Sequence, residues 1–242
     1  MPVEESSPRL KLKPNMKKRC AIGRISWIVL CGLLPGMAEA QGAHGKVLYQ
    51  SHFETAAAGA LPDGLLALDG DFKVKEAESN RVLELPGAPA ENFYGALFGP
   101  ATNSGVCVSA RICGTGARRR FPSFGVGLNG ASGYCLRVSP GKGVLEIYKG
   151  DEARTNTAMV WKTGAWTMLR LQVRPGTNQA YPSWRVEGKA WEQGTAEPKD
   201  WMIAVEEKTA PPTGRASLWG TPYSGTPIWF DDLKLSEIAD GE

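Results

Sequence analysis

Short segments in which apolar and polar residues alternate recur along this chain from residue 47 to residue 235, separated by Gly, Pro or Asn. Gly or Pro interrupts every candidate for a helix of three turns, and only residues 192–200 leave room for a single helical turn. This pattern is typical of a β-sandwich or a β-barrel, and it predicts one all-β domain. The predicted strands are Val47–Phe53, Phe72–Lys75, Arg81–Leu85, Tyr94–Phe98, Gly105–Cys113, Ser123–Leu128, Tyr134–Ser139, Val144–Lys149, Ala158–Lys162, Trp166–Val173, Ser183–Glu187, Arg215–Trp219 and Thr226–Leu235.

The central strands show which side chains face the core, because successive side chains of a strand point to opposite sides of the sheet. Every second residue of 105–113, 123–128 and 134–139 is apolar, and Asn129-Gly130 between the last two segments is a strong hairpin signal. We therefore expect the three strands to pair as a meander in one sheet.

That meander predicts a binding face. Its pairing would set Arg111, Gly125, Gly127 and Arg137 on one outward surface. Glycines in a strand leave a flat place that another backbone, a packed side chain or a ligand can approach. A planar guanidinium offers several donors to hydroxyls or carboxylates. If the domain binds a ligand, this is the face that the pattern predicts for it.

The last strand breaks the alternation. Ile228 and Phe230 share one face, but the next apolar residues are Leu233 and Leu235. Keeping all four in the core needs one extra residue, which a β-bulge at Asp231-Asp232 supplies.

The N-terminus has the order of an export signal, and residues 1–40 are predicted to be a signal peptide. A basic stretch precedes the apolar run Ile25–Leu34, and Ala38-Glu39-Ala40 precedes Gln41. Met16 is an alternative start, and a lipid on Cys31 is an alternative that the bulky residue before it disfavours. The apolar run is too short to span a bilayer and no second run follows, so the protein is expected to be secreted or periplasmic, without a membrane span.

Charge speaks against nucleic acid as a partner. Residues 1–40 hold seven of the 28 Lys and Arg and three of the 25 Asp and Glu, which leaves 21 basic and 22 acidic side chains in residues 41–242. Nucleic-acid binding needs a clustered positive field, and the only basic run, Arg118–Arg120, falls where a hairpin loop is expected. The three remaining cysteines, Cys107, Cys113 and Cys135, match no zinc or redox spacing, and we expect free, packed thiols.

Catalytic signatures are missing from the sequence. The alternating carboxylates of a retaining glucanase, Glu-x-Asp-x-x-Glu, do not occur, there is no Gly-x-Ser-x-Gly, and His44 and His52 are the only histidines. No catalytic residue is assigned, and a non-enzyme is favoured. The one cofactor that the pattern suggests is a structural calcium ion held by Glu54, Asp231 and Asp232, which the first and last strands would bring together if they pair. The alternative is a bulge whose aspartates cap neighbouring backbone amides.

Aromatic residues suggest further ligand contacts. Residues 41–242 contain seven tryptophans, most of which are expected in the core. Trp191, Trp201 and Tyr223 fall in or beside predicted loops, and of these Trp191 and Tyr223 are taken as ligand-binding candidates.

The C-terminal half resembles a known family. Gly188-Lys189-Ala190-Trp191, Gly214-Arg215-Ala216 and Trp229-Phe230-Asp231-Asp232-Leu233, with the opening Phe53-Glu54 and Leu61-Pro62-Asp63-Gly64, resemble bacterial exported concanavalin A-like lectin/glucanase domains, including LamG-like and 3-keto-disaccharide hydrolase-like members. The resemblance covers nearly all of residues 41–242 and implies a two-sheet antiparallel sandwich of the jelly-roll type. Because this fold carries lectins, hydrolases and lyases, it implies an exported module that binds a carbohydrate or another cell-surface component. The alternative is a glycoside hydrolase or lyase.

Overall fold

The computed structural model describes residues 45–239, except 78–79, 89–92, 178–179 and 224. The predicted signal peptide, residues 1–40 with Met16 and Cys31, lies outside the described residues, as does the expected mature start at Gln41. The chain forms two compact units, residues 1–40 and residues 41–242, and the fold described here is that of the second unit. Among the described residues, none forms a helix long and apolar enough to cross a membrane.

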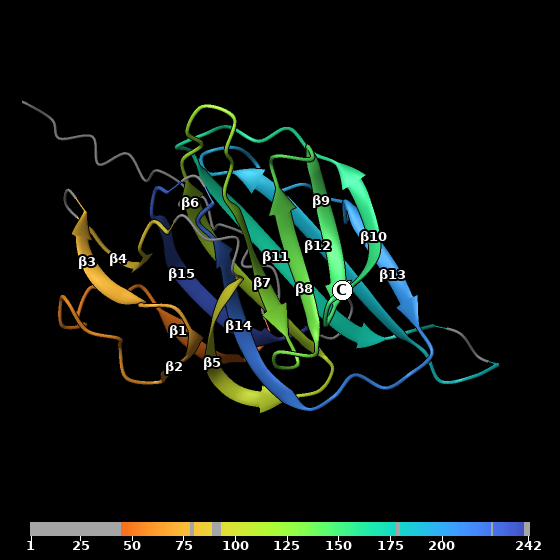
Figure 1. The fold of residues 1–242 in the computed structure, drawn as a ribbon. Coiled ribbons are helices and arrows are strands. Elements are labelled where there is room, and N and C mark those ends of the chain that lie inside the picture. Colours follow the sequence, from red (N-terminus) through yellow and green to blue (C-terminus); the bar gives the residue numbers. More distant parts are fainter. Residues whose placement is uncertain (1–44, 78–79, 89–92, 178–179, 224, 240–242) are drawn as a thin grey trace, which may run out of the picture. The chain divides into compact units, whose positions relative to one another are not determined.

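All the regular structure described is β, in two antiparallel sheets (Figure 1). Sheet A has the order β13-β12-β11-β6-β15-β4-β3, with β1 also paired to β15, and sheet B has the order β10-β9-β8-β7-β14-β5-β2. The strands of sheet A are β1 (Val47–Ser51), β3 (Lys73–Ala77), β4 (Asn80–Leu85), β6 (Val106–Gly114), β11 (Trp166–Pro175), β12 (Trp184–Glu192), β13 (Ile203–Glu207) and β15 (Ile228–Glu237). Those of sheet B are β2 (Leu65–Asp69), β5 (Tyr94–Thr102), β7 (Ser123–Leu128), β8 (Tyr134–Ser139), β9 (Val144–Lys149), β10 (Glu152–Ala158) and β14 (Gly214–Thr221).

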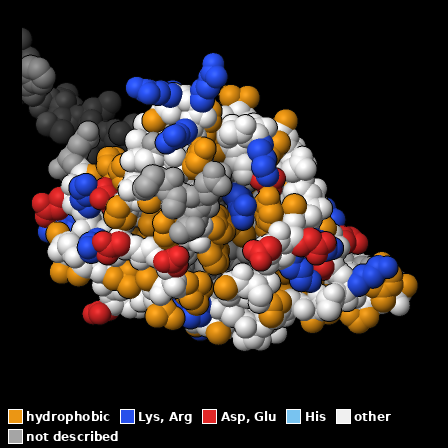
Figure 2. All heavy atoms as spheres, viewed as in Figure 1, with side chains coloured by type: hydrophobic (Ala, Val, Ile, Leu, Met, Phe, Trp, Pro, Cys, Tyr) orange, Lys and Arg blue, Asp and Glu red, His pale blue; other side chains and the backbone are white. Residues whose placement is uncertain are grey.

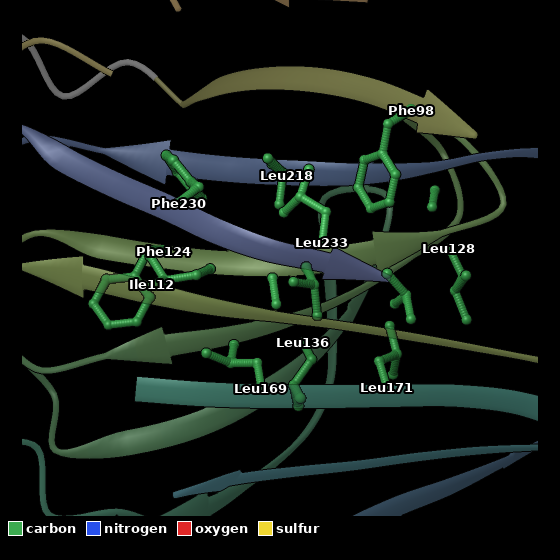
Figure 3. Packing of buried hydrophobic residues seen from close by; sticks show 14 of the residues in the cluster. Phe98, Ile112, Phe124, Leu128, Leu136, Leu169, Leu171, Leu218, Phe230 and Leu233 are labelled. Atoms are coloured by element: carbon green, nitrogen blue, oxygen red, sulfur yellow. The ribbon is translucent and has the colours of Figure 1, made fainter. Parts of the chain in front are cut away.

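The core lies between the two sheets, and Figure 3 shows side chains from both reaching into it. Each strand turns its apolar face toward the core, because alternating apolar and polar residues give the strand one apolar face and burial of that face is favourable. Sheet A contributes Ile112, Leu169, Leu171, Phe230 and Leu233, and sheet B contributes Phe98, Phe124, Leu128, Leu136 and Leu218, all without exposed surface. The predicted two-sheet sandwich is therefore confirmed.

The predicted bulge is also confirmed. The register of β15 against β6 shifts between Asp231 and Lys234, and Asp232 adopts a positive φ of 52°. This extra residue keeps Phe230 and Leu233 both fully buried. The first and last strands pair as expected, β1 against β15.

The predicted central meander is wrong. The hairpin of β7 and β8 forms, but β6 lies between β11 and β15 in sheet A, whereas β7 lies between β8 and β14 in sheet B. The segment between β6 and β7 therefore crosses from one sheet to the other. Arg111 on β6 and Arg137 on β8 consequently belong to the outer faces of different sheets, and Gly125 and Gly127 accompany Arg137 alone.

Edge strands account for the other differences. The sequence pattern missed β2 and β13, and it placed a strand at Ala158–Lys162 where the chain has β10 at Glu152–Ala158. All three lie at the end of a sheet, where one side of the strand meets solvent and alternation is weak. Residues 192–200 contain a hydrogen-bonded turn, with the Thr195 amide donating to the Glu192 carbonyl, and no helix.

Candidate functional site

The outer face of sheet A, the side away from sheet B, carries tryptophans in register. Trp229 on β15 and Trp166 on β11 are both paired with Cys113 on the intervening β6. Two strand spacings separate the two tryptophans, roughly 10 Å. Arg111 follows in the next outward position of β6, where it is paired with Asp231 and Met168.

A hollow of about 480 Å³ lies beside Trp166, Trp229 and Arg111, and we call it the tryptophan hollow. Its volume is within the usual range for small-molecule sites. It is lined by Glu76, Ala77, Asn80, Val82, Arg111, Cys113, Gly164, Trp166 and Trp229. Indole surface and hydrogen-bonding groups therefore border the same space.

The two indoles are held in different ways. Trp229 donates from Nε1 to Glu84 across a 2.8 Å hydrogen bond, which fixes the orientation of its ring. Within the described part of the chain, no ring or cation stacks on Trp229. The guanidinium of Arg111 lies over the ring of Trp166, 4.7 Å from its centroid, a favourable cation–π geometry.

Arg111 is anchored by the bulge of β15. Its Nη2 is 2.6 Å from Oδ2 of Asp231, and its Nε is 2.9 Å from Oδ2 of Asp232. The side chain of Arg111 is 17% exposed and that of Asp231 only 1%. The bulge thus turns two successive carboxylates toward one guanidinium, and the arginine is positioned rigidly at the margin of the hollow.

The two bulge carboxylates, Asp231 and Asp232, are also two of the three predicted calcium ligands. The third group near Asp231 and Asp232 is His52, whose Nδ1 is 2.6 Å from Asp232. Glu54 accepts a hydrogen bond from the Arg81 amide instead. A calcium ion needs six to eight oxygen ligands.

Every oxygen of the two aspartates already has a donor beside it. One Asp231 oxygen faces Arg111 and Asn80, and the other accepts from the Asp232 amide. Those of Asp232 face Arg111 and His52. Arg111 therefore supplies the positive charge that a calcium ion would bring, and calcium at this bulge stays a prediction.

The outer face of sheet B carries Arg137 in a different setting. The guanidinium lies between two rings, 4.1 Å from the centroid of Phe93 and 4.0 Å from that of Tyr148. Phe93 in turn stacks on Trp219, with centroids 5.0 Å apart and planes 4° from parallel. Figure 2 views the molecule from the side of β7, β8 and β9, where hydrophobic side chains and a basic side chain lie close together and most other charged side chains lie nearer the margin.

The glycines of this face serve close packing. A Cβ on Gly125 would collide with the Leu136 carbonyl of the neighbouring strand, and one on Gly127 would collide with Ser217 Oγ. The indole of Trp219 lies against Gly95. The flat place that the sequence predicted is thus occupied by the protein's own side chains and backbone.

The other two predicted ligand-binding residues, Trp191 and Tyr223, also lie in different parts of the domain. Trp191 on β12 belongs to the face of Arg111, one strand beyond Met168. Tyr223 lies in the loop before β15, with the Arg120 guanidinium 5.7 Å from its ring centroid. The structure therefore brings Arg111 and Trp191 to one face, Arg137, Gly125 and Gly127 to the other, and Tyr223 to neither.

The expectation that most tryptophans are core residues is wrong, since none of the seven in the described chain is fully buried. Alternation contained the signal: Trp229 lies between the core residues Ile228 and Phe230, so it must point outward. Trp166 precedes the inward Thr167 in the same way.

The thiols agree with the prediction, because Cys107, Cys113 and Cys135 are buried and form no disulfide in the described part of the chain. Cys107 and Cys113 both lie on β6 of sheet A, whereas Cys135 lies on β8 of sheet B. Burial raises the pKa of Cys135 to about 11, so it stays a neutral thiol at physiological pH.

A buried charge cluster holds β11 to β12 on the outer face of sheet A. Glu187 is 3% exposed and takes Nε of Arg174 at 2.9 Å and Nε of Arg185 at 2.6 Å. Burial by itself raises the pKa of Glu187, but the hydrogen bonds from Arg174, Arg185 and Gln172 lower it below the usual value. Glu187 is therefore an ionised structural carboxylate.

Comparison with known proteins supports the fold and leaves the family open. No protein-family model matches the sequence, and no curated protein matches it. Solved structures do match, at low identity.

Three solved structures are similar over about four fifths of this chain. A Bacillus subtilis protein of unknown function with a galectin-like fold is 10% identical, with a TM-score of 0.51, over 81% of this chain and 98% of that one. A chain from the endo-acting O-glycanases that prominent members of the human gut microbiota express to initiate mucin breakdown is 10% identical, with a TM-score of 0.53, over 80% and 100%. The exoplasmic/lumenal domain of VIP36 in its Ca2+-bound form is 10% identical, with a TM-score of 0.52, over 83% and 95%. The chain has the fold of these lectin-like sandwiches.

Proposed function

We propose that this chain is an exported, non-catalytic module that binds glycans in the tryptophan hollow. The observation that carries the proposal is the free face of Trp229 beside Trp166 and Arg111 in a hollow of about 480 Å³. The N-terminal signal pattern of residues 1–40 supports the exported location.

The chemistry of the hollow suits a sugar ring. A pyranose has an apolar C–H face, which an indole covers at little cost in entropy, and an edge of hydroxyls that need directed partners. Trp229 offers the indole face, while Arg111 and the amide of Asn80 border the same space. Both polar groups are already anchored on Asp231, so little side-chain entropy is lost on binding.

The class of neighbouring folds is consistent with this ligand. Two of the three similar structures are a glycanase and a lumenal domain that has a Ca2+-bound form. At about 10% identity this likeness concerns the fold alone, so the glycan is argued from the hollow and not from the neighbours.

Binding is favoured over the alternative of a glycoside hydrolase or lyase. A hydrolase needs two carboxyl groups about 5 Å or about 6.5–9.5 Å apart across the scissile bond. The carboxylate that lines the hollow, Glu76, pairs with Arg81 at 3.1 Å, and Glu84 pairs with Lys75 at 2.9 Å while accepting from Trp229. Both carboxylates are engaged in structural contacts.

The test is a glycan array probed with residues 41–242, followed by calorimetric titration of the hits. Trp229→Ala and Trp166→Ala should each weaken binding at least about tenfold, or about 1.4 kcal/mol. Trp219→Ala is the matched control, since it removes a half-exposed tryptophan from the opposite sheet and should leave the affinity within a factor of two.

Three results would contradict the proposal. An array without hits would remove glycan binding. Loss of affinity in Trp219→Ala, but not in Trp229→Ala, would transfer the site to the outer face of sheet B. Release of reducing sugar from any bound glycan by the wild-type chain would make the protein a hydrolase.

A further inference from the structure

A second, smaller hollow lies further along β6 on the same face. Ser109 follows Arg111 as the next outward residue of β6, about 7 Å further along the strand. The second hollow has a volume of about 170 Å³. It is lined by Cys107, Ser109, Met168, Arg170, Trp191, Glu197, Lys234 and Ser236, and we call it the lysine hollow.

Cations outnumber carboxylates around the lysine hollow. Glu197 is shared by two of them, Nη1 of Arg170 at 3.1 Å and Nζ of Lys189 at 2.8 Å. Lys234, half-buried on β15, has no ion-pair partner among the residues that the structure describes. Arg170 also donates from Nε to the Cys107 sulfur at 3.1 Å, so Glu197 and Cys107 are engaged by Arg170 and Lys189 and not by Lys234.

The neighbouring acidic groups do not compensate Lys234. Asp231 and Asp232 are directed at Arg111, Asn80 and His52. Glu187 is directed at Arg174 and Arg185. Burial by itself raises the pKa of Glu197, but the hydrogen bond from Lys189 and the charge of Arg170 lower it, so this carboxylate is ionised and its charge is already matched.

Uncommitted hydrogen-bond donors lie beside Lys234. The hydroxyls of Ser109 and Ser236 make no side-chain hydrogen bond within the described part of the chain, and both line the lysine hollow with Lys234. An ammonium and two hydroxyls are a suitable donor set for the two oxygens of a carboxylate, and charge-assisted hydrogen bonds are the strong ones. Trp191 adds an apolar wall to the same space.

We infer that the glycan of this site is acidic, with the carboxylate of a uronic acid residue held by Lys234, Ser109 and Ser236 while a neighbouring sugar occupies the tryptophan hollow. This inference rests on the proposed function and assigns its ligand class. Arg111 in the lining of the tryptophan hollow and Ser109 in the lining of the lysine hollow are two residues apart on β6, about 7 Å, so adjacent residues of one oligosaccharide can reach both hollows.

The experiment compares acidic oligosaccharides with their neutral counterparts. Oligomers of galacturonate, of mannuronate and of glucuronate-containing hyaluronan are each titrated beside the same oligomer with its carboxyl groups reduced to alcohols. Wild-type protein should bind at least one acidic oligomer about tenfold more tightly than its reduced form. The difference should shrink between about 20 mM and 300 mM NaCl, because salt screens the exposed charges.

Lys234→Gln should abolish this preference by lowering the affinity for the acidic oligomer about tenfold. Lys142→Gln is the matched control, since it makes the same charge change in the turn between β8 and β9 of the opposite sheet. Melting temperatures of both variants establish that they fold.

The outcomes separate the two proposals. Equal affinity for acidic and reduced oligomers, array hits that are all neutral, or an equal loss in Lys142→Gln would overturn the acidic ligand and leave glycan binding intact. Tight binding of sulfated but not of uronic oligomers would replace the carboxylate by a sulfate ester. Absence of binding to every glycan would sink the proposed function itself.

Discussion

The adjacent residues Trp229 and Phe230 provide the sharpest test of the architecture, because alternation along β15 places them on opposite sides of sheet A. Phe230 is fully buried and packs on Phe72 with ring centroids 5.9 Å apart. Trp229 is half-exposed at the tryptophan hollow. Exchange of each for alanine should therefore have very different effects on the free energy of unfolding.

The magnitude follows from burial. A phenyl ring takes about 150 Å² or more out of water, which at about 25 cal/mol per Å² is close to 4 kcal/mol, and measured Phe→Ala losses in cores are about 3–5 kcal/mol. Phe230→Ala should cost that much, or roughly 6–20 °C in Tm for a domain of this size. Trp229→Ala loses part of an indole and one hydrogen bond to Glu84, about 1–2 kcal/mol.

Urea denaturation followed by tryptophan fluorescence and far-UV circular dichroism measures both values. The slope with denaturant should stay constant, so that the midpoint shift reports stability. Leu233→Ala, on the far side of the bulge, should lose about 2–5 kcal/mol, in the same range as Phe230→Ala. A loss below about 1.5 kcal/mol for Phe230→Ala, or a larger loss for Trp229→Ala, would refute the inward and outward assignment of β15.

Three further predictions concern the terminus, the bulge and the buried charges. N-terminal sequencing of protein recovered from the envelope or the medium should begin near Gln41, and an intact Met1 or Met16 would contradict export. Arg111→Met leaves Asp231 and Asp232 without their main counter-charge. Millimolar calcium should therefore raise the Tm of this variant by several degrees and that of the wild type by less than about 1 °C. Equal stabilisation of both proteins would mean that calcium binds beside the arginine. Glu187→Gln should cost about 2 kcal/mol at pH 7. The pKa of Glu187 is lower in the folded state than the unfolded value of about 4.5, so the stabilisation by its charge is complete above the unfolded value and is lost as the pH falls through the folded value. The free energies of unfolding of the two proteins should therefore converge on acidification. A difference that is independent of pH would show that charge plays no part.

The sequence alone determined what each strand does locally. Period-two alternation identified the buried residues of β6, β7 and β8, and the broken alternation of β15 located the bulge at Asp231-Asp232. It also contained the outward position of Trp229, which lies between two core residues. These features follow from the pleat of a single strand, so no knowledge of its partners is needed.

Which strands are neighbours was decided by the tertiary structure. A strand of sheet A and a strand of sheet B both turn an apolar face to the same core, so their sequence patterns are identical in kind, and nothing local shows that β6 and β7 belong to different sheets. The outward-pointing side chains therefore form two faces on opposite sides of the core. Arg111 shares one face with Trp166, Trp229 and Lys234, and Arg137 shares the other with Phe93 and Tyr148. The edge strands β2, β10 and β13 were misjudged for a related reason, since a strand that is half solvated needs no strict alternation. The candidate site is a property of strand order, which is set by the packing of the whole domain.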